Sequence, residues 1–256
     1  MKVTLLQADL KWASPESNAQ AFEESILNAR NSEIDCKSDL YVLPEMWSTG
    51  FTTQPEGIAE EFGTSCQSLE WMKDMADKTD AAIAGSVAVH CSDGSYRNRF
   101  FFVKPGGEYV YYDKHHLFTY GGEHHRYTAG NERVVVEWRG VRFLLLVCYD
   151  LRFPKWARSN EDYDAIIYVA SWPTPRVEAW NTLLRARAIE DQCYVIGVNR
   201  VGSDPSCEYC GGTAFIDPYG TAQMCPYGEV SALAGQIDME SLNAFRQKFP
   251  VLSDRD

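Results

Sequence analysis

The stretch Val141–Pro154, VRFLLLVCYDLRFP, decides how this 256-residue sequence folds. Its apolar residues from Phe143 to Cys148 run without a break and stop at a charged, aromatic segment, which predicts a fully buried strand with a sharp exit. Cys148 lies at that exit. Because ligands meet open α/β sheets at the carboxyl ends of the strands, a thiol placed there can act as a nucleophile. A buried structural cysteine is the alternative, since free cysteine is among the residue types most often buried.

Composition and charge exclude several classes of protein. A hydrophobic content of 45% is ample for a continuous core, and a formal net charge of -12 argues against a nucleic-acid partner, because phosphate binding needs a cationic surface. No apolar run approaches the roughly 18 residues of a membrane span, and the N-terminal apolar run is too short for a signal peptide. The eight cysteines have no regular spacing, so we expect reduced thiols in a cytoplasmic protein.

One CxxC pair, Cys207 and Cys210, raises the alternative of a zinc protein. A zinc site would need a second Cys or His pair at matching spacing, and all five histidines lie far upstream, at positions 90, 115, 116, 124 and 125. We therefore expect paired surface thiols here, and neither a metal nor a cofactor.

Strands and helices alternate in the first half of the chain. Ser14 and Pro15 give a helix start, and apolar residues follow at helical spacing. The predicted strands of this half are 2–7, 39–43, 81–89, 97–103 and 108–112, and its predicted helices follow Ser14 and span the apolar residues of 69–76.

The same pattern begins again after a Gly-rich and His-rich loop at 120–130. The predicted elements are a hairpin of strands 133–138 and 141–148, a short helix after Pro154, a strand at 165–170, a helix opened by Pro175, strands at 194–201 and 213–217, and a terminal helix at 239–249. Two similar α/β halves are expected to pack as sheets face to face with helices outside. Because no linker separates the halves, residues 1–256 are expected to form a single domain.

Chemically useful side chains follow three of the predicted strands. Glu45 comes after the strand 39–43, Lys114 after 108–112, and Cys148 ends the strand 141–148. Each has an ordinary structural explanation: Glu45 as an acid at a helix start, Lys114 as a surface cation, and Cys148 as a core residue. Their similar placement favours a shared site.

The motifs around these residues resemble those of the nitrilase superfamily of carbon-nitrogen hydrolases. Two of them, the first and the third, are unusually specific, and all three occur in the family's order. Agreement continues through later segments, so the resemblance covers about residues 1 to 240. The motifs are LPEM at 43–46, YDKHHLF at 112–118 and CYDLRFP at 148–154, followed by AIE at 188–190, VNRVG at 198–202 and GGTAFIDPYG at 211–220.

This resemblance implies a four-layer αββα sandwich and a Glu-Lys-Cys triad. A free cysteine has a pKa of about 8.5, so an adjacent base must take the Cys148 proton or a cation must stabilise its thiolate, and Glu45 can be that base. When the sulfur attacks an amide carbonyl, Lys114 and the backbone N–H of Tyr149 can stabilise the negative oxygen. Glu45 would then protonate the departing ammonia and activate water against the thioester.

The family also implies a second glutamate and an assembly. Glu123 matches the glutamate that orders the catalytic lysine, with a solvated loop acid as the alternative. Homodimerisation is expected, with the helix after Pro154 and the helix at 177–188 packing between subunits.

Within the superfamily, the MWSTGF segment at 46–51 and the ASWP segment at 170–173 resemble the omega-amidase branch. Such enzymes hydrolyse the terminal amide of short 2-oxo dicarboxylic acid monoamides, such as 2-oxoglutaramate. The expected pocket walls are Phe118, Tyr149 and Trp172, with Arg176 as the partner of a substrate carboxylate.

Other activities remain open at this stage. Another branch of the family would hydrolyse aliphatic amides or N-carbamoyl amino acids, or act as a true nitrilase. A non-catalytic interaction protein on the same scaffold is disfavoured, because all three triad residues are present.

Overall fold

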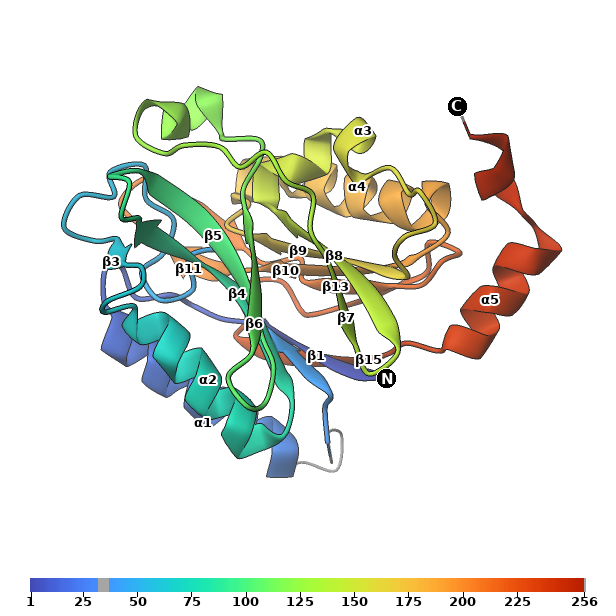
Figure 1. Cartoon of the computed structure of the whole chain (residues 1–256), viewed down its shortest axis with the longest axis horizontal. Helices are drawn as coiled ribbons and strands as arrows, with labels where there is room; N and C mark the ends of the chain where they lie inside the picture. The colour runs from blue at the N-terminus through green and yellow to red at the C-terminus, as the bar shows by residue number, and fades with distance from the viewer. Residues whose placement is uncertain (32–36, 256) are drawn as a thin grey trace.

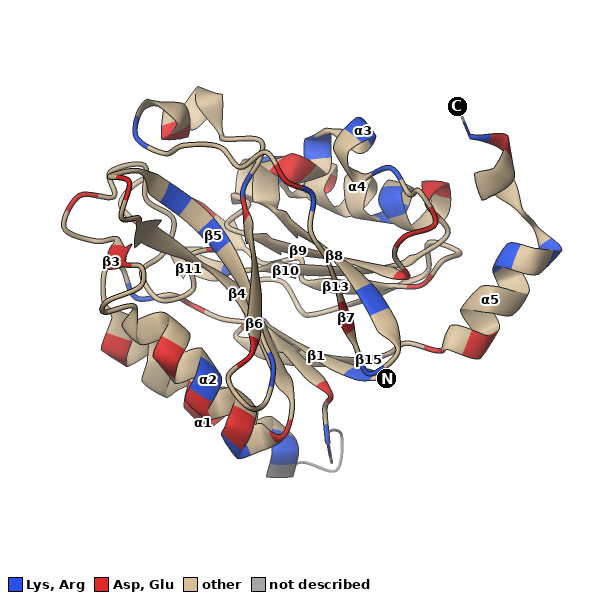
Figure 2. Cartoon of the chain, in the orientation of Figure 1, with Lys and Arg blue, Asp and Glu red and all other residues tan. Residues whose placement is uncertain are grey.

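The computed structural model describes residues 1–31 and 37–255, whose strands form two large sheets and a small one. The large sheets pack face to face, with α1 (Pro15–Asn31) and α2 (Gln67–Thr79) on one outer side and α3 (Pro154–Ala157) and α4 (Val177–Glu190) on the other (Figure 1). This arrangement confirms the predicted αββα sandwich. Charged residues lie mainly on the helices and loops around the sheets (Figure 2), because strands covered on both faces are largely apolar.

The first sheet has the strand order β15-β1-β2-β4-β5-β6, and β3 pairs with β4. Strands β1, β2 and β4 are parallel, β5 and β6 continue antiparallel, and β15 pairs antiparallel with β1. The bounds are β1 (Lys2–Gln7), β2 (Leu40–Val42), β3 (Glu60–Glu61), β4 (Ala82–His90), β5 (Tyr96–Val103), β6 (Tyr109–Asp113) and β15 (Ser231–Gln236).

The second sheet, in the order β7-β8-β9-β10-β13-β14, repeats this pattern. Its strands β8, β9 and β10 are parallel, β13 and β14 continue antiparallel, and β7 is the antiparallel edge. The two predicted halves therefore share one strand order. The bounds are β7 (Val135–Trp138), β8 (Val141–Val147), β9 (Ala165–Ala170), β10 (Tyr194–Asn199), β13 (Ala214–Ile216) and β14 (Ala222–Met224); β11 (Val201–Ser203) and β12 (Glu208–Cys210) form the small sheet, and α5 (Met239–Lys248) follows β15.

Apolar side chains fill the spaces between these layers. The main core lies between the sheets, where the rings of Phe102 and Phe143 have their centroids 5.9 Å apart, and it continues through the second sheet to Trp180 and Leu184 of α4. A second core lies between the first sheet and its helices, where Phe22 of α1 meets Trp47 edge-on at 5.8 Å. Because both faces of the first sheet are covered, the sequences of its parallel strands are short apolar runs and do not alternate between apolar and polar residues.

Two predicted boundaries near the site are corrected by the structure. Strand β8 stops at Val147, and Cys148 begins a 3₁₀ turn instead of ending the strand. The helix expected to open at Pro175 begins at Val177, because the proline lies within a separate 3₁₀ turn. In both places a 3₁₀ turn precedes the next helix: Cys148–Arg152 precedes α3, and Thr174–Arg176 precedes α4.

The predicted strand 194–201 is split at Arg200 into β10 and β11. Arg200 is fully buried and donates to the backbone carbonyls of Leu10 and Ser203. These bonds draw the chain out of the second sheet and towards the loop after β1, so β11 pairs with β12 instead.

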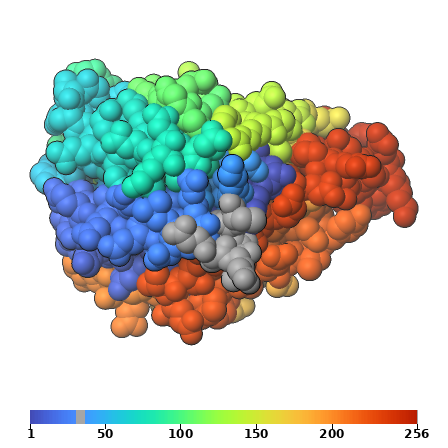
Figure 3. Space-filling view, turned by 90° about the horizontal axis from the view of Figure 1, so that it is seen from below, coloured from blue at the N-terminus to red at the C-terminus, as the bar shows by residue number. Residues whose placement is uncertain are grey.

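The N-terminal strand β1 pairs in the first sheet with β15, the last strand of the chain. Lys2 pairs with Gln236 in the β1–β15 ladder, and the N-terminal ammonium donates to the carbonyl of Ile237 at 2.8 Å. Figure 3 shows the red and orange C-terminal part of the chain alongside the blue N-terminal part. Within the described residues, none of the helices combines the length and apolar character needed to cross a membrane.

Gly197 in β10 permits the close approach of α4. A Cβ at this position would lie 2.5 Å from Leu184 Cδ1 and 3.0 Å from the ring of the fully buried Trp180. We expect Gly197→Ala to lower the free energy of unfolding by about 1–3 kcal/mol through overpacking, as measured by chemical denaturation. In a Leu184→Ala background the same change should cost less; an equal cost in both backgrounds would contradict this explanation.

Candidate active site

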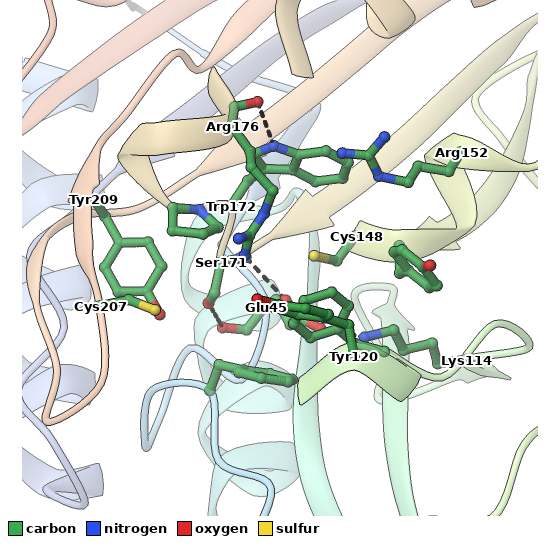
Figure 4. A pocket seen from close by; sticks show the side chains of 14 residues that line it. Glu45, Lys114, Tyr120, Cys148, Arg152, Ser171, Trp172, Arg176, Cys207 and Tyr209 are labelled. Atoms are coloured by element: carbon green, nitrogen blue, oxygen red, sulfur yellow. Dashed lines mark hydrogen bonds and ion pairs between the residues drawn. The ribbon is translucent and has the colours of Figure 1, made fainter. Parts of the chain in front are cut away.

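The side chains of Glu45, Lys114 and Cys148 meet at one cavity of about 480 Å³ (Figure 4). Glu45 follows β2 and Lys114 follows β6 in the first sheet, whereas Cys148 follows β8 in the second. The cavity is also lined by the walls predicted from the sequence, Phe118, Tyr149 and Trp172, and by the predicted carboxylate partner Arg176. The face-to-face packing of the sheets thus brings together residues that lie more than 100 positions apart.

Lys114 is buried between two carboxylates. Its Nζ lies 2.9 Å from Glu45 Oε1 and 2.9 Å from Glu123 Oε2, and all three side chains are inaccessible to solvent. Burial alone would lower the pKa of Lys114, but the charges of Glu123 and Glu45 together raise this pKa well above its ordinary value. The ammonium therefore stays protonated at any physiological pH.

The Glu45 carboxylate is held by donors from three directions. Its Oε1 accepts from Asn98 Nδ2 at 2.8 Å as well as from Lys114, and its Oε2 accepts from the backbone N–H of Ser171 at 2.9 Å. The chain turns away directly after it, because Met46 has a φ of +45° and donates its N–H to Ser86. These contacts leave Glu45 one orientation, facing the cavity.

Glu123 comes from a 3₁₀ turn in the His-rich loop and is fully buried, so it is not the solvated loop acid considered as an alternative. Its Oε2 accepts from the backbone N–H of Phe118 at 2.6 Å, in addition to the ion pair with Lys114. Burial raises the pKa of Glu123 above its ordinary value, although Lys114 opposes this shift. Asn98 Nδ2 also approaches Glu123 Oε1 at 3.3 Å.

Cys148 has a backbone conformation that few non-glycine residues adopt, with a φ of +46°. The sharp turn after β8 places Cys148 at the edge of the main core, where it lines the cavity. Burial and the negative charge of Glu45 raise the pKa of the Cys148 thiol well above its ordinary value, against the opposing effect of Lys114. The resting thiol is therefore neutral, and nucleophilic attack requires transfer of its proton to a base.

Two guanidinium groups line the same cavity. Arg176 Cζ lies 5.4 Å from the ring centroid of Phe118, and Arg152 Cζ lies 5.0 Å from that of Trp172. Within residues 1–31 and 37–255, neither guanidinium takes part in an ion pair with a carboxylate. A cavity that combines a thiol, a buried ammonium and the guanidiniums of Arg152 and Arg176 favours an anionic ligand.

Several site residues were not found from the sequence. Asn98 lies in the middle of β5, where a polar residue gives no signal of its contacts. Arg152 stands four positions after Cys148 in the stretch Val141–Pro154, and this short distance in sequence from the predicted nucleophile could have indicated that Arg152 lines the same cavity. The cavity further includes Phe51, Tyr120, Ser171, Pro173, Cys207 and Tyr209.

The Cys207 and Cys210 pair lies on the hairpin of β11 and β12, and both thiols are free. Only Cys207 reaches the cavity. Over the described part of the chain, no group of three or more His, Cys, Asp or Glu side chains is arranged to hold a metal ion.

Comparison with known proteins places these observations in a family. A sequence model described as carbon-nitrogen hydrolase matches residues 2–247. Omega-amidase YafV of Escherichia coli strain K12 is 44% identical over 258 residues, covering 100% of this chain and 97% of that protein. The 2-oxoglutaramate amidase of Bacillus subtilis strain 168 is 36% identical over 257 residues, covering 98% and 96%.

Solved structures agree with this assignment. XC1258 from Xanthomonas campestris, a CN-hydrolase superfamily protein, superposes with a TM-score of 0.93 at 37% identity, covering 100% of this chain and 97% of that one. Saccharomyces cerevisiae Nit3, of the nitrilase superfamily, shares the fold with a TM-score of 0.89 at 22% identity over 98% of this chain and 94% of that one. Because the family model and these relatives match nearly its whole length, the chain belongs to the carbon-nitrogen hydrolase family.

Proposed function

We propose that this protein is an omega-amidase, which hydrolyses the terminal amide of a short 2-oxo dicarboxylic acid monoamide to the dicarboxylate and ammonia. The observation that carries this proposal is the cavity that joins the thiol of Cys148 and the buried ammonium of Lys114 to the guanidiniums of Arg152 and Arg176. Relatives named omega-amidase and 2-oxoglutaramate amidase, at 44% and 36% identity, support the same substrate class.

In the first step, Cys148 attacks the amide carbonyl while Glu45 takes the thiol proton. A C–S bond forms, and the carbonyl π electrons move to the oxygen. The permanently charged Lys114 and the N–H of Tyr149 stabilise this oxyanion, and Glu123 holds the ammonium in place through its ion pair. The neutral resting thiol makes the base essential, because little thiolate is present before the substrate binds.

In the second step, the C–N bond breaks and Glu45 returns its proton to the departing ammonia, which leaves a thioester on Cys148. Water then enters, gives a proton to Glu45 and attacks the thioester carbonyl. The C–S bond breaks, the proton returns to sulfur and the dicarboxylate leaves. One carboxylate thus serves as base, acid and base again.

Arg152 and Arg176 are proposed to bind the carboxylate at the far end of the substrate. Charge-assisted hydrogen bonds are worth about 1.5–3 kcal/mol, so Arg152→Met and Arg176→Met should each raise KM for 2-oxoglutaramate by about 10-fold to 100-fold. Steady-state assays of ammonia release measure this change. A short uncharged amide provides the control, because its KM should not change; equal losses on both substrates would refute carboxylate recognition.

A substrate panel tests the proposed function directly. It compares ammonia release from 2-oxoglutaramate, 2-oxosuccinamate, glutamine, N-carbamoyl-β-alanine and a simple nitrile. We expect the two 2-oxo acids to have the highest kcat/KM, because they combine a terminal amide with a carboxylate at a short distance. A preference for the carbamoyl compound or the nitrile would assign the chain to another branch of the family.

We further propose a homodimer in which α3 and α4 pack against those of a second subunit. Ile189, near the end of α4, is 55% exposed, and Tyr219, on the neighbouring β13–β14 turn, is 66% exposed. An apolar surface of this kind fits burial in an assembly. Light scattering after gel filtration of the parent chain and of Ile189→Glu tests this, with a monomeric parent as the contradicting result.

We also propose one domain for residues 1–256 and a cytoplasmic location. The shared core between the two sheets supports the single domain. Free thiols at all seven cysteines of the described residues support a reducing compartment.

A further inference from the structure

Asp150, two residues after Cys148, carries a fully buried carboxylate that accepts four hydrogen bonds. Its Oδ1 accepts from the backbone N–H of His116 at 2.9 Å and from His116 Nδ1 at 2.8 Å. Its Oδ2 accepts from the hydroxyl of Tyr112 at 2.8 Å and from the backbone N–H of Val147 at 3.0 Å. Neither Glu45 nor Lys114 is among these partners, so Asp150 stands outside the group that performs the chemistry.

The four donors come from both sides of the sandwich. Val147 directly precedes Cys148, so its bond to Asp150 closes the turn in which Cys148 has its positive φ. Tyr112 and His116 lie two residues before and two residues after Lys114. One carboxylate therefore ties the nucleophile's turn, from the second sheet, to the segment that carries Lys114, from the first.

Neighbouring contacts tighten this connection. The Tyr112 hydroxyl also accepts from the N–H of His115 at 3.0 Å and from Trp156 Nε1 at 3.2 Å. The His115 ring stacks on Trp156 with centroids 3.7 Å apart, and the His116 ring stacks on Phe153 at 3.9 Å. The segment 112–116 thus lies against the segment 147–156 through both polar and ring contacts.

We propose that Asp150 is a positioning residue, which sets the place of the Cys148 sulfur relative to the Lys114 ammonium and Glu45. This inference rests on the proposed function of that site. A strained backbone such as that of Cys148 persists only where the surroundings determine it. The Asp150 carboxylate supplies such a constraint, because it accepts the N–H of Val147, the residue directly before Cys148.

The chemistry of the four donors explains why a carboxylate stands here. The N–H groups of His116 and Val147 bind different oxygens, and a backbone N–H cannot act as an acceptor. An asparagine has one oxygen, so its NH₂ group would face one of these N–H groups in either orientation. Asp150→Asn keeps the shape of the side chain and still breaks one side of the connection.

The main test is the kinetics of Asp150→Asn on 2-oxoglutaramate. Because a misplacement of about 1 Å can cost about 100-fold in rate, we expect kcat to fall by about 10-fold to 100-fold while KM stays near the parent value. Asp164→Asn is the matched control. Asp164 is also buried and accepts from Arg142 and Arg246, but it lies at the amino end of β9, at the other end of the strands. This control should lose stability and keep its kcat.

Alkylation of Cys148 by iodoacetamide gives a readout that needs no amide substrate. The rate, followed by mass spectrometry of the peptide containing Cys148, should fall in Asp150→Asn and fall less in Tyr112→Phe, which removes one donor. If the parent protein hydrolyses no member of the amide panel but these alkylation rates change as expected, the proposed function fails and the positioning role stands.

A different set of results would overturn the positioning role. Asp150→Asn would then melt at a lower temperature, as Asp164→Asn does, while its kcat and alkylation rate match those of the parent. If Asp150→Asn does not fold, Tyr112→Phe decides the question: an unchanged kcat and alkylation rate in that variant would refute the proposal, and a fall in both with KM unchanged would support it.

Discussion

Cys148→Ala is expected to fold normally and to lose ammonia release from 2-oxoglutaramate by about 10⁴-fold or more, as removal of a catalytic nucleophile does in other hydrolases. The reason is chemical, because no thioester can form without the sulfur. Alanine removes one atom at the edge of the cavity and leaves the ion pairs of Lys114 in place. Steady-state assays and a thermal melt of the same preparation measure the two halves of this prediction.

Cys207→Ala is the matched control for the loss of a thiol. Cys207 lines the same cavity as Cys148 but comes from the β11–β12 hairpin. Its variant should keep kcat within a few-fold of the parent. Undiminished turnover in Cys148→Ala, or an equal loss in both variants, would refute the covalent mechanism.

Lys114→Met is expected to impair both catalysis and stability. Loss of one oxyanion-stabilising donor costs about 10²-fold to 10³-fold in kcat. The change also leaves two buried carboxylates, Glu45 and Glu123, without their shared cation. Breaking a buried ion pair in this way costs about 3–5 kcal/mol, which chemical denaturation at pH 7 should detect.

The stability loss in Lys114→Met should depend on pH in a defined direction. Burial already raises the pKa of Glu123 while Lys114 opposes the shift, so removing the lysine raises this pKa further. A carboxyl group with a raised pKa in the folded state stabilises the protein in its protonated form, and this contribution is lost as pH rises through the folded-state pKa. The deficit relative to the parent should therefore shrink as pH falls from 8 towards 5.

A second substitution separates charge repulsion from loss of packing in this variant. Adding Glu123→Gln to Lys114→Met removes one of the two unpaired charges, so part of the lost stability should return at pH 7 while kcat stays low. If the double variant is as unstable as Lys114→Met at every pH, the stabilising role of the ammonium between the carboxylates is wrong.

Local sequence was sufficient to place most strands and the three central side chains. Apolar runs such as 143–148 end abruptly at polar residues, and burial of such runs is governed by the hydrophobic effect over a few neighbouring residues. Glu45, Lys114 and Cys148 could therefore be assigned to strand ends without knowledge of the fold. The family motifs around them identified the αββα sandwich, the family and Glu123.

Contacts between distant segments could not be derived in this way. Asn98 reaches both carboxylates from β5, Arg152 turns into the cavity from the 3₁₀ turn after Cys148, and Asp150 bonds to a segment more than 30 positions away. The short and largely unburied strand β15 returns from near the C-terminal end of the chain to pair with β1. Apart from the four-residue spacing of Arg152 from Cys148, these residues do not differ in type or spacing from ordinary strand, turn or surface residues.

The local sequence thus specifies which residues stand at the ends of strands, because the apolar side chains of a strand are enough to predict that it is buried and where it ends. The tertiary structure specifies what those residues do to each other. The ion pair of Lys114 with Glu45 joins two distant segments of the first sheet. The raised pKa of the Cys148 thiol comes from burial and from the charge of Glu45 across the sandwich, and the positive φ of Cys148 comes from the tight turn after β8. The opening stretch VRFLLLVCYDLRFP therefore predicts a thiol at a strand's exit, and only the opposing sheet brings it beside Glu45 and Lys114.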